Sequence, residues 1–154
     1  MKKIKLTALL LTLTLVATFL CGCSDKTEKN RVTDIIREAA VVSINGVESD
    51  TVEAQMGAFQ GKQGDYIEFR FSEPQTFNTV FITEKTATVR QFNIYAEIDS
   101  KYTLVYTGKH ILQENIKIEA VTATAFKLEI VNTQIGNDNF IIQNVSAYNI
   151  FEGE

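Results

Sequence analysis

The stretch over residues 65–83 constrains the fold more than any other part of the sequence. Residues 66–71 alternate strictly, with one isoleucine and two phenylalanines on one side and polar or tyrosine side chains on the other. A period of two is typical of a strand with one buried face, because successive side chains leave a strand on opposite faces. Pro74, the only proline, is expected to end this strand, since it cannot donate a ladder hydrogen bond. Residues 76–83 then resume with apolar side chains on both faces. The stretch therefore predicts two core strands joined by a proline connection.

Further segments alternate in a similar way and are separated by polar turns. They predict strands over residues 89–98, 102–107, 114–119, 123–131 and 140–150. Residues 99–101 and 134–139 are polar and contain turn-forming side chains. Many short strands at near-regular spacing predict an all-β fold, either an antiparallel sandwich or a barrel.

Residues 33–64 have a weaker pattern. Thr33 or Asp34 could cap a short helix that ends at Ala40, or a strand could cover residues 40–44. A long loop is expected over residues 47–64, with one short strand near residues 52–56. Long loops in compact domains often carry binding sites.

The N-terminus has the pattern of a secretory signal peptide, which we predict over residues 1–22. Lys2, Lys3 and Lys5 precede an apolar stretch that carries no further charge up to residue 20. The alternative is an uncleaved membrane anchor. Removal of the three lysines would change the net charge from −4 to about −7. This balance argues against nucleic acid or an anionic membrane surface as a partner.

Residues 20–23 read Leu-Cys-Gly-Cys and resemble the bacterial lipoprotein box. Cys23 fits this motif, whereas Cys21 does not. The resemblance implies cleavage before Cys23 and lipidation of Cys23, followed by a flexible tether over residues 23–32 and a domain over residues 33–154. The protein would be held at the bacterial cell envelope, facing outside the cytoplasm. The alternative is two ordinary cysteines near the end of a signal peptide. With its one remaining cysteine lipidated, the mature chain would form no disulfide and no cysteine-based metal site.

The order of the strands resembles the galactose-binding-like β-sandwich, the jelly roll of discoidin and coagulation-factor C domains and of many carbohydrate-binding modules. The resemblance covers residues 40–150 and implies an antiparallel β-sandwich after the signal peptide. The five segments that carry it are Asp65-Tyr66-Ile67-Glu68-Phe69-Arg70-Phe71, Glu73-Pro74-Gln75-Thr76-Phe77-Asn78-Thr79-Val80, Arg90-Gln91-Phe92-Asn93-Ile94-Tyr95, Ala123-Thr124-Ala125-Phe126-Lys127-Leu128-Glu129-Ile130 and Ile142-Gln143-Asn144-Val145-Ser146-Ala147-Tyr148.

The same resemblance implies a structural calcium ion, held by oxygen atoms near the start and the end of the domain. The residues at the matching positions are Asn45, Asp50, Thr51 and Asn144. The sequence departs from the family pattern, because asparagines replace two acids and the usual tryptophan is missing. Fewer carboxylates predict weak or absent calcium binding, and the alternative is a turn with solvated acids.

The sequence does not predict an enzyme. His110 is the only histidine and lacks the nucleophile and acid that a catalytic triad needs around it. The acids are spread over strand faces and turns, unlike the carboxylate pair of glycoside hydrolases. No glycine-rich phosphate loop joins a strand to a helix.

In the resembled family, sugars bind among loops at one end of the sandwich. Such a site needs an aromatic ring for the C–H face of the sugar and polar groups for its hydroxyls. The implied ligand-binding residues are Phe59, Gln60, Arg90, His110, Asn137 and Phe140.

The predicted function is a non-catalytic, surface-anchored lipoprotein module that binds carbohydrate. Its expected partners are the membrane, through the lipid, and a glycan or an envelope protein. The alternative is a structural or protein-interaction sandwich that has lost its sugar site. The missing tryptophan favours the alternative, whereas the anchor and the loop over residues 57–64 favour carbohydrate binding.

Overall fold

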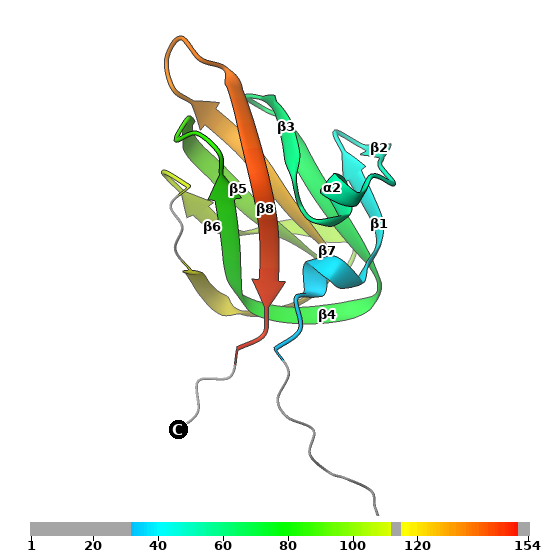
Figure 1. Cartoon of the computed structure of the whole chain (residues 1–154). Helices are drawn as coiled ribbons and strands as arrows, with labels where there is room; N and C mark the ends of the chain where they lie inside the picture. Colours follow the sequence, from blue (N-terminus) through cyan, green and yellow to red (C-terminus); the bar gives the residue numbers. More distant parts are fainter. Residues whose placement is uncertain (1–31, 112–114, 151–154) are drawn as a thin grey trace, which may run out of the picture. The chain divides into compact units, whose positions relative to one another are not determined.

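The computed structural model describes residues 32–111 and 115–150, which form antiparallel strands and two short helices (Figure 1). The elements are the 3-10 helix η1 (Ile35–Glu38), β1 (Ala39–Ile44), β2 (Val47–Glu48), the helix α2 (Val52–Gln55), β3 (Phe59–Lys62), β4 (Tyr66–Glu84), β5 (Val89–Ile98), β6 (Lys101–Gly108), β7 (Asn115–Thr133) and β8 (Asn139–Tyr148). The predicted signal peptide, Cys23 and all of the tether except Val32 lie outside the described residues. Among the described residues, no helix has the length and apolar character needed to cross a membrane.

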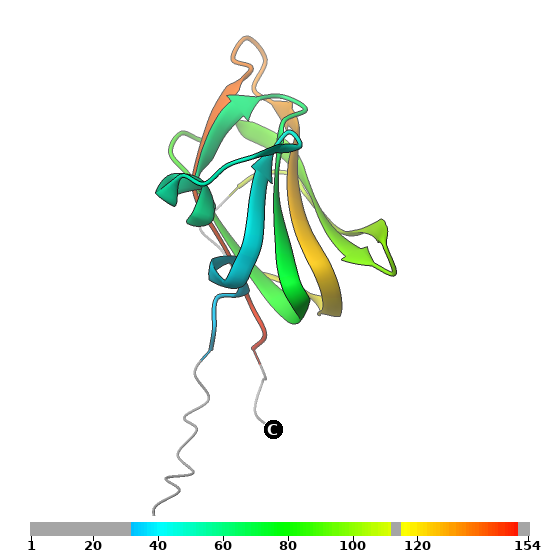
Figure 2. The ribbon, with the colours of Figure 1, turned by 90° about the vertical axis from the view of Figure 1, so that its right-hand side faces the viewer.

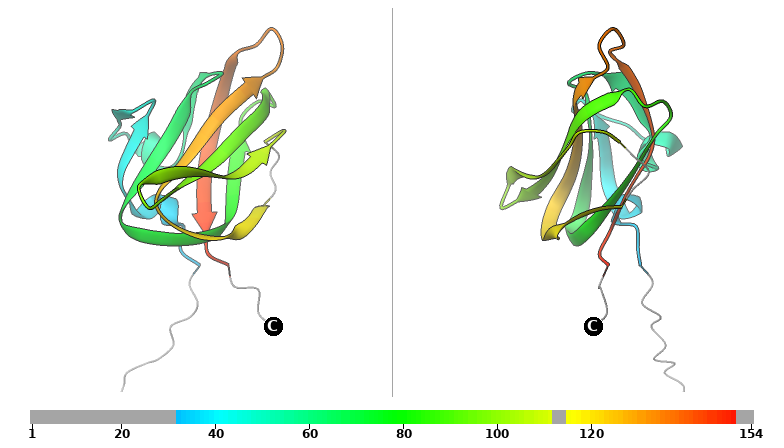
Figure 3. Two further views of the ribbon diagram at one scale, coloured as in Figure 1. Left: turned by 180° about the vertical axis from the view of Figure 1, so that it is seen from behind. Right: turned by 90° about the vertical axis from the view of Figure 1, so that its left-hand side faces the viewer.

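The strands form two layers that share the long strands β4 and β7. Sheet A has the order β2-β1-β4-β7-β5-β6 and contains residues 66–71 of β4 and 123–133 of β7. Sheet B contains β3, β8, residues 76–84 of β4 and residues 115–121 of β7. Figure 3 shows sheet A from behind, with β7 between β4 and β5. The predicted antiparallel β-sandwich is confirmed.

The core fills the space between the two sheets and is rich in phenylalanine. The Phe126 ring lies 6.1 Å from Phe69 and 5.6 Å from Phe77, measured between ring centroids. All three side chains are completely buried. Each buried ring contributes about 1.5–3 kcal/mol through removal of apolar area from water. The inward side chains of β5 are the ones that the alternation predicts, because Phe92, Ile94 and Ala96 are all buried.

Pro74 does not end the strand, which corrects the predicted break. β4 continues from residue 66 to residue 84, and the bend at the proline carries it from sheet A to sheet B. The register with β7 moves from Arg70 opposite Ala125 to Gln75 opposite Ala123, so β4 contains extra residues at this point. A proline is tolerated in such a bulge because no ladder hydrogen bond is required of it.

Three other predictions differ from the structure. Residues 52–55 form a helix instead of a strand, because the Thr51 side chain accepts a hydrogen bond from the Ala54 amide and caps it. Residues 59–62 form the strand β3 within the predicted loop. The strands predicted over residues 114–119 and 123–131 are one continuous strand, β7.

The hairpin of β5 and β6 has a two-residue turn at its end. Asp99 and Ser100 have φ of 49° and 62°, and Ile98 pairs with Lys101. Two successive positive φ angles fit the twist of a tight hairpin. Figure 2 shows this hairpin projecting from the sandwich beside β4 and β7.

Candidate functional site

The two aromatic residues predicted to contact a sugar are both buried, which corrects that expectation. Phe59 is 5% exposed and Phe140 is 1% exposed. Their ring centroids lie 5.1 Å apart with an interplanar angle of 74°, an edge-to-face pair that closes the core between β3 and β8. Neither ring can offer a flat face to a ligand.

Gln60 and Phe140 lie together beside a hollow of about 460 Å³ at the end of β3 and β8. Its other lining residues include Lys62, Asp65 and Asn139. Asn137 is close by in the chain, and its side-chain oxygen accepts a hydrogen bond of 3.3 Å from the Asn139 amide. The structure thus brings three of the predicted residues to one end of the sandwich, but without an exposed ring.

Arg90 has a structural role at the start of β5. Its guanidinium donates hydrogen bonds to the carbonyl oxygens of Ala87 (2.9 Å) and Val89 (3.2 Å) and to the side chain of Gln134 (3.2 Å). These bonds tie two neighbouring loops together. They leave Arg90 less free to bind a ligand than the sequence prediction assumed.

His110 lies at the mouth of a second pocket, which we call the β5–β6 pocket. This pocket of about 220 Å³ lies between the two sheets, and the described residues that line it are Ile82, Phe92, Tyr106, Lys109, His110, Ile111 and Ile116. Lys109 and His110 are exposed, whereas the apolar residues of the wall are buried or half-buried. The β5–β6 pocket therefore combines an apolar, aromatic wall with two nitrogen-bearing side chains.

Local sequence features build this wall. The Phe92 ring lies over Gly108, where any side chain would collide with it. The Tyr106 ring packs against Phe92 with centroids 6.0 Å apart. In the pairing of β6 with β5, Leu104 lies opposite Tyr95 and Tyr106 lies opposite Ile94, so Val105 has no partner and forms a bulge. The bulge places Tyr106 on the inner face with Ile94, and its side chain therefore lines the pocket. Sequence analysis missed Tyr106, since this bulge cannot be read from the alternation.

The predicted calcium ligands are not brought together. The Asn45 side chain accepts a hydrogen bond of 2.9 Å from the Tyr66 amide at the end of β1. The Asn144 oxygen accepts one of 3.0 Å from the guanidinium of Arg37, before the start of β1. A six-residue strand spans roughly 20 Å and separates the two places. The Asn144 oxygen, which would have to face a bound cation, instead faces the positively charged guanidinium of Arg37. The residues present do not fit the calcium site of the resembled family.

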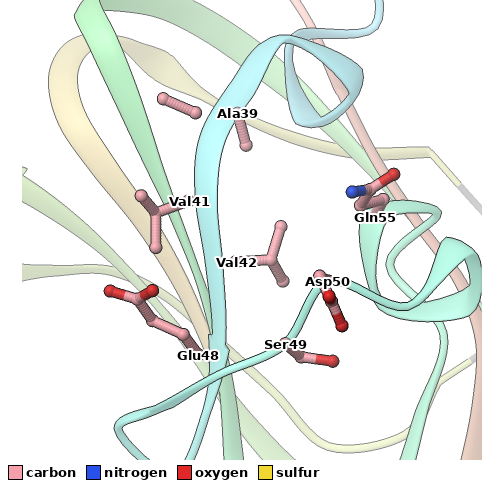
Figure 4. Close-up of a pocket in the computed structure, with 8 residues that line it drawn as sticks. Ala39, Val41, Val42, Glu48, Ser49, Asp50 and Gln55 are labelled. Carbon is pink, nitrogen blue, oxygen red and sulfur yellow. The ribbon is translucent and has the colours of Figure 1, made fainter.

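Asp50, another predicted calcium ligand, lies in a third pocket of about 380 Å³ along the edge of β1 (Figure 4). Glu48, Ser49 and Gln55 lie around it, whereas neither Asn45 nor Asn144 lines this pocket. Thr51 is occupied in capping α2. Among the described residues, no group of three or more acids, histidines or cysteines is placed to hold a metal ion.

No family model and no curated protein matches the chain. Solved structures do match it. The family 32 carbohydrate-binding module of Streptococcus pneumoniae EndoD has a TM-score of 0.62 and 14% identity, covering 77% of this chain and 100% of the module. A chitosan-binding module from a chitosanase/glucanase of Paenibacillus has a TM-score of 0.58 and 18% identity, covering 73% and 96%.

Larger proteins match as well. A GH29 fucosidase of Ruminococcus gnavus has a TM-score of 0.59 and 17% identity, covering 78% of this chain. The chain spans 18–27% of the fucosidase chains that it matches. The neighbours matched over nearly their whole length are binding modules. The chain therefore has the galactose-binding-like β-sandwich fold, as predicted from its sequence.

Proposed function

We propose that the chain is a non-catalytic carbohydrate-binding module and that the β5–β6 pocket holds a sugar. The observation that carries this proposal is the combination of the Tyr106 and Phe92 wall with Lys109 and His110 at the mouth. The fold shared with solved carbohydrate-binding modules supports it.

The chemistry of the pocket matches the two faces of a sugar ring. Half-buried Tyr106 and Ile116 offer apolar surface for the C–H groups. Lys109 donates hydrogen bonds to hydroxyl oxygens, and His110 can donate or accept one. A volume of about 220 Å³ suits a single ring or the end of a chain better than a long oligosaccharide.

The lining also favours binding over glycoside hydrolysis. Hydrolysis generally uses two carboxyl groups that flank the scissile bond. The described residues that line this pocket include no aspartate or glutamate. Among the described lining residues, a bound sugar would therefore meet hydrogen-bond donors and apolar surface.

A glycan array probed with the full chain tests this function. The chain would be kept in a detergent without a sugar headgroup, so that the detergent cannot compete. We expect binding to a defined set of glycans, reduced about tenfold or more in His110→Ala, because loss of one or two hydrogen bonds costs about 1–3 kcal/mol. Lys101→Ala, an exposed change at the far end of β6, is the matched control and should bind normally.

If the folded chain bound no glycan, the protein-interaction alternative would replace this proposal. A specific feature favours that alternative. Three large apolar side chains are exposed on β2 and around α2, namely Val47 (71%), Val52 (65%) and Met56 (47%). Capture of envelope proteins by wild type, but not by Val47→Asp, would support it.

We further propose that the domain is anchored to a membrane of the bacterial envelope through a lipid on Cys23. The support is the Leu-Cys-Gly-Cys motif behind a basic and then apolar N-terminus. Metabolic labelling with a clickable palmitate analogue, followed by membrane fractionation, tests it. Wild type should be labelled and sediment with membranes, and Cys23→Ala should lose the label, with Cys21→Ala as the control. Equal labelling of both variants would contradict the proposal.

A further inference from the structure

The outer face of sheet A carries an ordered set of aromatic and charged side chains. The strand registers place it in rows, because cross-strand partners share a face. Glu68 on β4 lies opposite Lys127 on β7, which lies opposite Tyr95 on β5. Tyr95 in turn lies opposite Leu104 on β6. We call this surface the tyrosine face and define it by Tyr66, Glu68, Arg70, Tyr95, Glu97, Tyr102, Leu104, Lys127 and Glu129.

Lys127 lies at the centre of the tyrosine face and contacts three rings. Its ammonium nitrogen is 4.4 Å from the ring centroid of Tyr95, 4.5 Å from that of Tyr102 and 5.3 Å from that of Tyr66. Cation–π attraction holds the three rings, which come from three different strands, around one charge. Among the described residues, no carboxylate forms an ion pair with this ammonium. Its N–H groups thus remain available to a ligand.

Charged side chains around the rings are fixed by one another. Arg70 pairs with Glu68 at 2.8 Å and with Glu97 at 2.9 Å. The Tyr95 hydroxyl donates a hydrogen bond of 2.8 Å to Glu129. A site whose groups are already held in place loses less conformational entropy on binding. The tyrosine face is therefore preorganised.

The hydroxyls of Tyr95 and Tyr102 remain protonated over the physiological range. Burial and a hydrogen bond to Glu68 raise the pKa of Tyr102. Burial and a hydrogen bond to Glu129 raise the pKa of Tyr95. Both side chains are therefore neutral rings, which suit contact with the C–H groups of a sugar, while their hydroxyl protons are engaged by Glu129 and Glu68.

The tyrosine face is flanked by exposed apolar side chains on β6 and β1. None of the three pockets described above includes one of its residues. On β6, Leu104 lies opposite Tyr95 and is 51% exposed. On β1, Val41 lies opposite Arg70 and is 37% exposed. Because sheet A is several strands wide here, a ligand that crosses it can continue beyond either edge. An enclosed pocket would instead select the end of a chain.

We propose that the tyrosine face is a second carbohydrate site, which binds an internal stretch of an extended, neutral polysaccharide. It lies on the outer side of β5, whereas the β5–β6 pocket lies on the inner side, so the two sites are separate. This inference shares only the class of ligand with the proposed function. Three glutamates and two cations give the tyrosine face a formal charge of −1, which disfavours polyanions.

Affinity electrophoresis of the full chain tests the second site. Native gels would contain soluble β-glucan, xylan, galactan or mannan, with polygalacturonate as an anionic comparison, and again a detergent without a sugar headgroup. We expect at least one neutral polymer to retard the chain. Tyr95→Ala and Leu104→Ala should weaken the retardation about two- to tenfold, since a stacked or apolar contact is worth about 0.5–1.5 kcal/mol.

Matched variants separate this site from the pocket. Thr103→Ala changes a neighbour of Leu104 that is also exposed but lies on the other side of β6, and it should have no effect. His110→Ala should leave the retardation intact. Leu104→Ala keeps the test valid if Tyr95→Ala misfolds, because Leu104 is largely exposed.

Chain length provides the second measurement. By titration calorimetry, affinity should rise about tenfold from the monosaccharide to the tetrasaccharide of the retarding polymer, as further contacts are added. Equal affinity for both, retardation that survives both Tyr95→Ala and Leu104→Ala, or retardation by polygalacturonate alone would overturn the inference. The inference would also be overturned if the chain bound array glycans through His110 but was retarded by none of the polymers. Failure on both the array and the gels would overturn the proposed function as well.

Discussion

Two glycines with similar backbone angles have different roles in this domain. Gly57 has a φ of 73° and Gly136 a φ of 83°, a region that favours glycine. A side chain on Gly57 would come within 2.6 Å of the Val145 amide nitrogen, whereas one on Gly136 would meet nothing within 4 Å. Gly57 thus allows the turn after α2 to touch β8, and Gly136 only shapes a loop.

The two glycines therefore provide a matched pair of variants. Gly136→Ala should cost about 1 kcal/mol through backbone strain alone. Gly57→Ala adds a steric clash with the backbone of β8 and should cost about 1–3 kcal/mol more. Chemical denaturation of both variants would measure the difference, and equal losses would show that the close approach to Val145 is not rigid.

Tyr102 gives a pH-dependent prediction. Burial, together with the hydrogen bond to Glu68, raises its pKa in the folded state above the ordinary value of about 10. The unfolded chain would then release this proton first. The stabilisation is complete below about pH 10 and is lost as pH rises through the folded-state pKa.

We therefore expect the free energy of unfolding to fall above about pH 10, and to fall less steeply in Tyr102→Phe. Denaturation at several alkaline pH values measures this, and ultraviolet difference spectroscopy should show delayed tyrosinate formation in wild type. Tyr148→Phe, which removes a tyrosine outside the tyrosine face, is the control. The same slope in all three proteins would show that Tyr102 titrates normally.

At the scale of elements, the long strands β4 and β7 decide the architecture, since each belongs to both sheets. The bend in β4 lies at residues 72–75 and leaves Pro74 exposed in a bulge. The proline therefore has no ladder hydrogen bond to replace, and its fixed φ limits the unfolded chain.

Pro74→Ala should lower the free energy of unfolding by only about 0.4–1 kcal/mol, because the change acts mainly on the unfolded state. Urea denaturation, with Ser72→Ala in the same exposed segment as the control, measures this. A loss above about 3 kcal/mol would indicate that the proline itself holds the two sheets in place.

Alternation predicted the strands that stay in one sheet, and it failed where a strand or loop depends on distant contacts. The bounds of β5 match the prediction, because its inward residues face one core throughout. The continuity of β4 and β7 depends on the packing of the two sheets, which no local pattern reports. β3 is four residues long with a glycine inside, so only its pairing with β8 identifies it as a strand.

The need for contacts between distant residues also explains which parts of the candidate sites could be predicted from the sequence. The position of His110 after a strand was readable, and the structure places it at a pocket. Phe59 and Phe140 were indistinguishable from loop aromatics until β3 paired with β8 and buried them. The tyrosines of the outer face are present in the alternating pattern as outward residues. Their convergence on Lys127 needed the strand order, which the sequence does not contain.

At the scale of the whole molecule, stability should not depend on calcium. The oxygen atoms of Asn45 and Asn144 are used in hydrogen bonds at opposite ends of β1. Thermal unfolding with calcium and with a chelator should therefore give the same midpoint. A clear rise in the midpoint with calcium would show a metal site built from other residues.

The two proposed sites lie on opposite sides of β5 and share no residue, so their energies should add. His110→Ala should weaken only the binding of a glycan end and Tyr95→Ala only the binding of an internal stretch, and the double variant should show each loss unchanged within about 0.5 kcal/mol. Titration calorimetry of the two single variants and the double variant measures this. A larger coupling would mean that one bound chain contacts both sites.

The two ends of the folded part leave the sandwich side by side. The Asp34 side chain accepts a hydrogen bond of 3.0 Å from the Ala147 amide, which joins the first turn of the domain to its last strand. Ile150 is held in turn by Asn78 through bonds of 2.7 and 2.9 Å. The first and last described segments of the domain therefore lie close together at the same end of the sandwich. A domain with such ends can be inserted into a loop of a larger protein without separating the two sides of that loop. The opposite end of the sandwich and its broad outer sheet would then face the solvent.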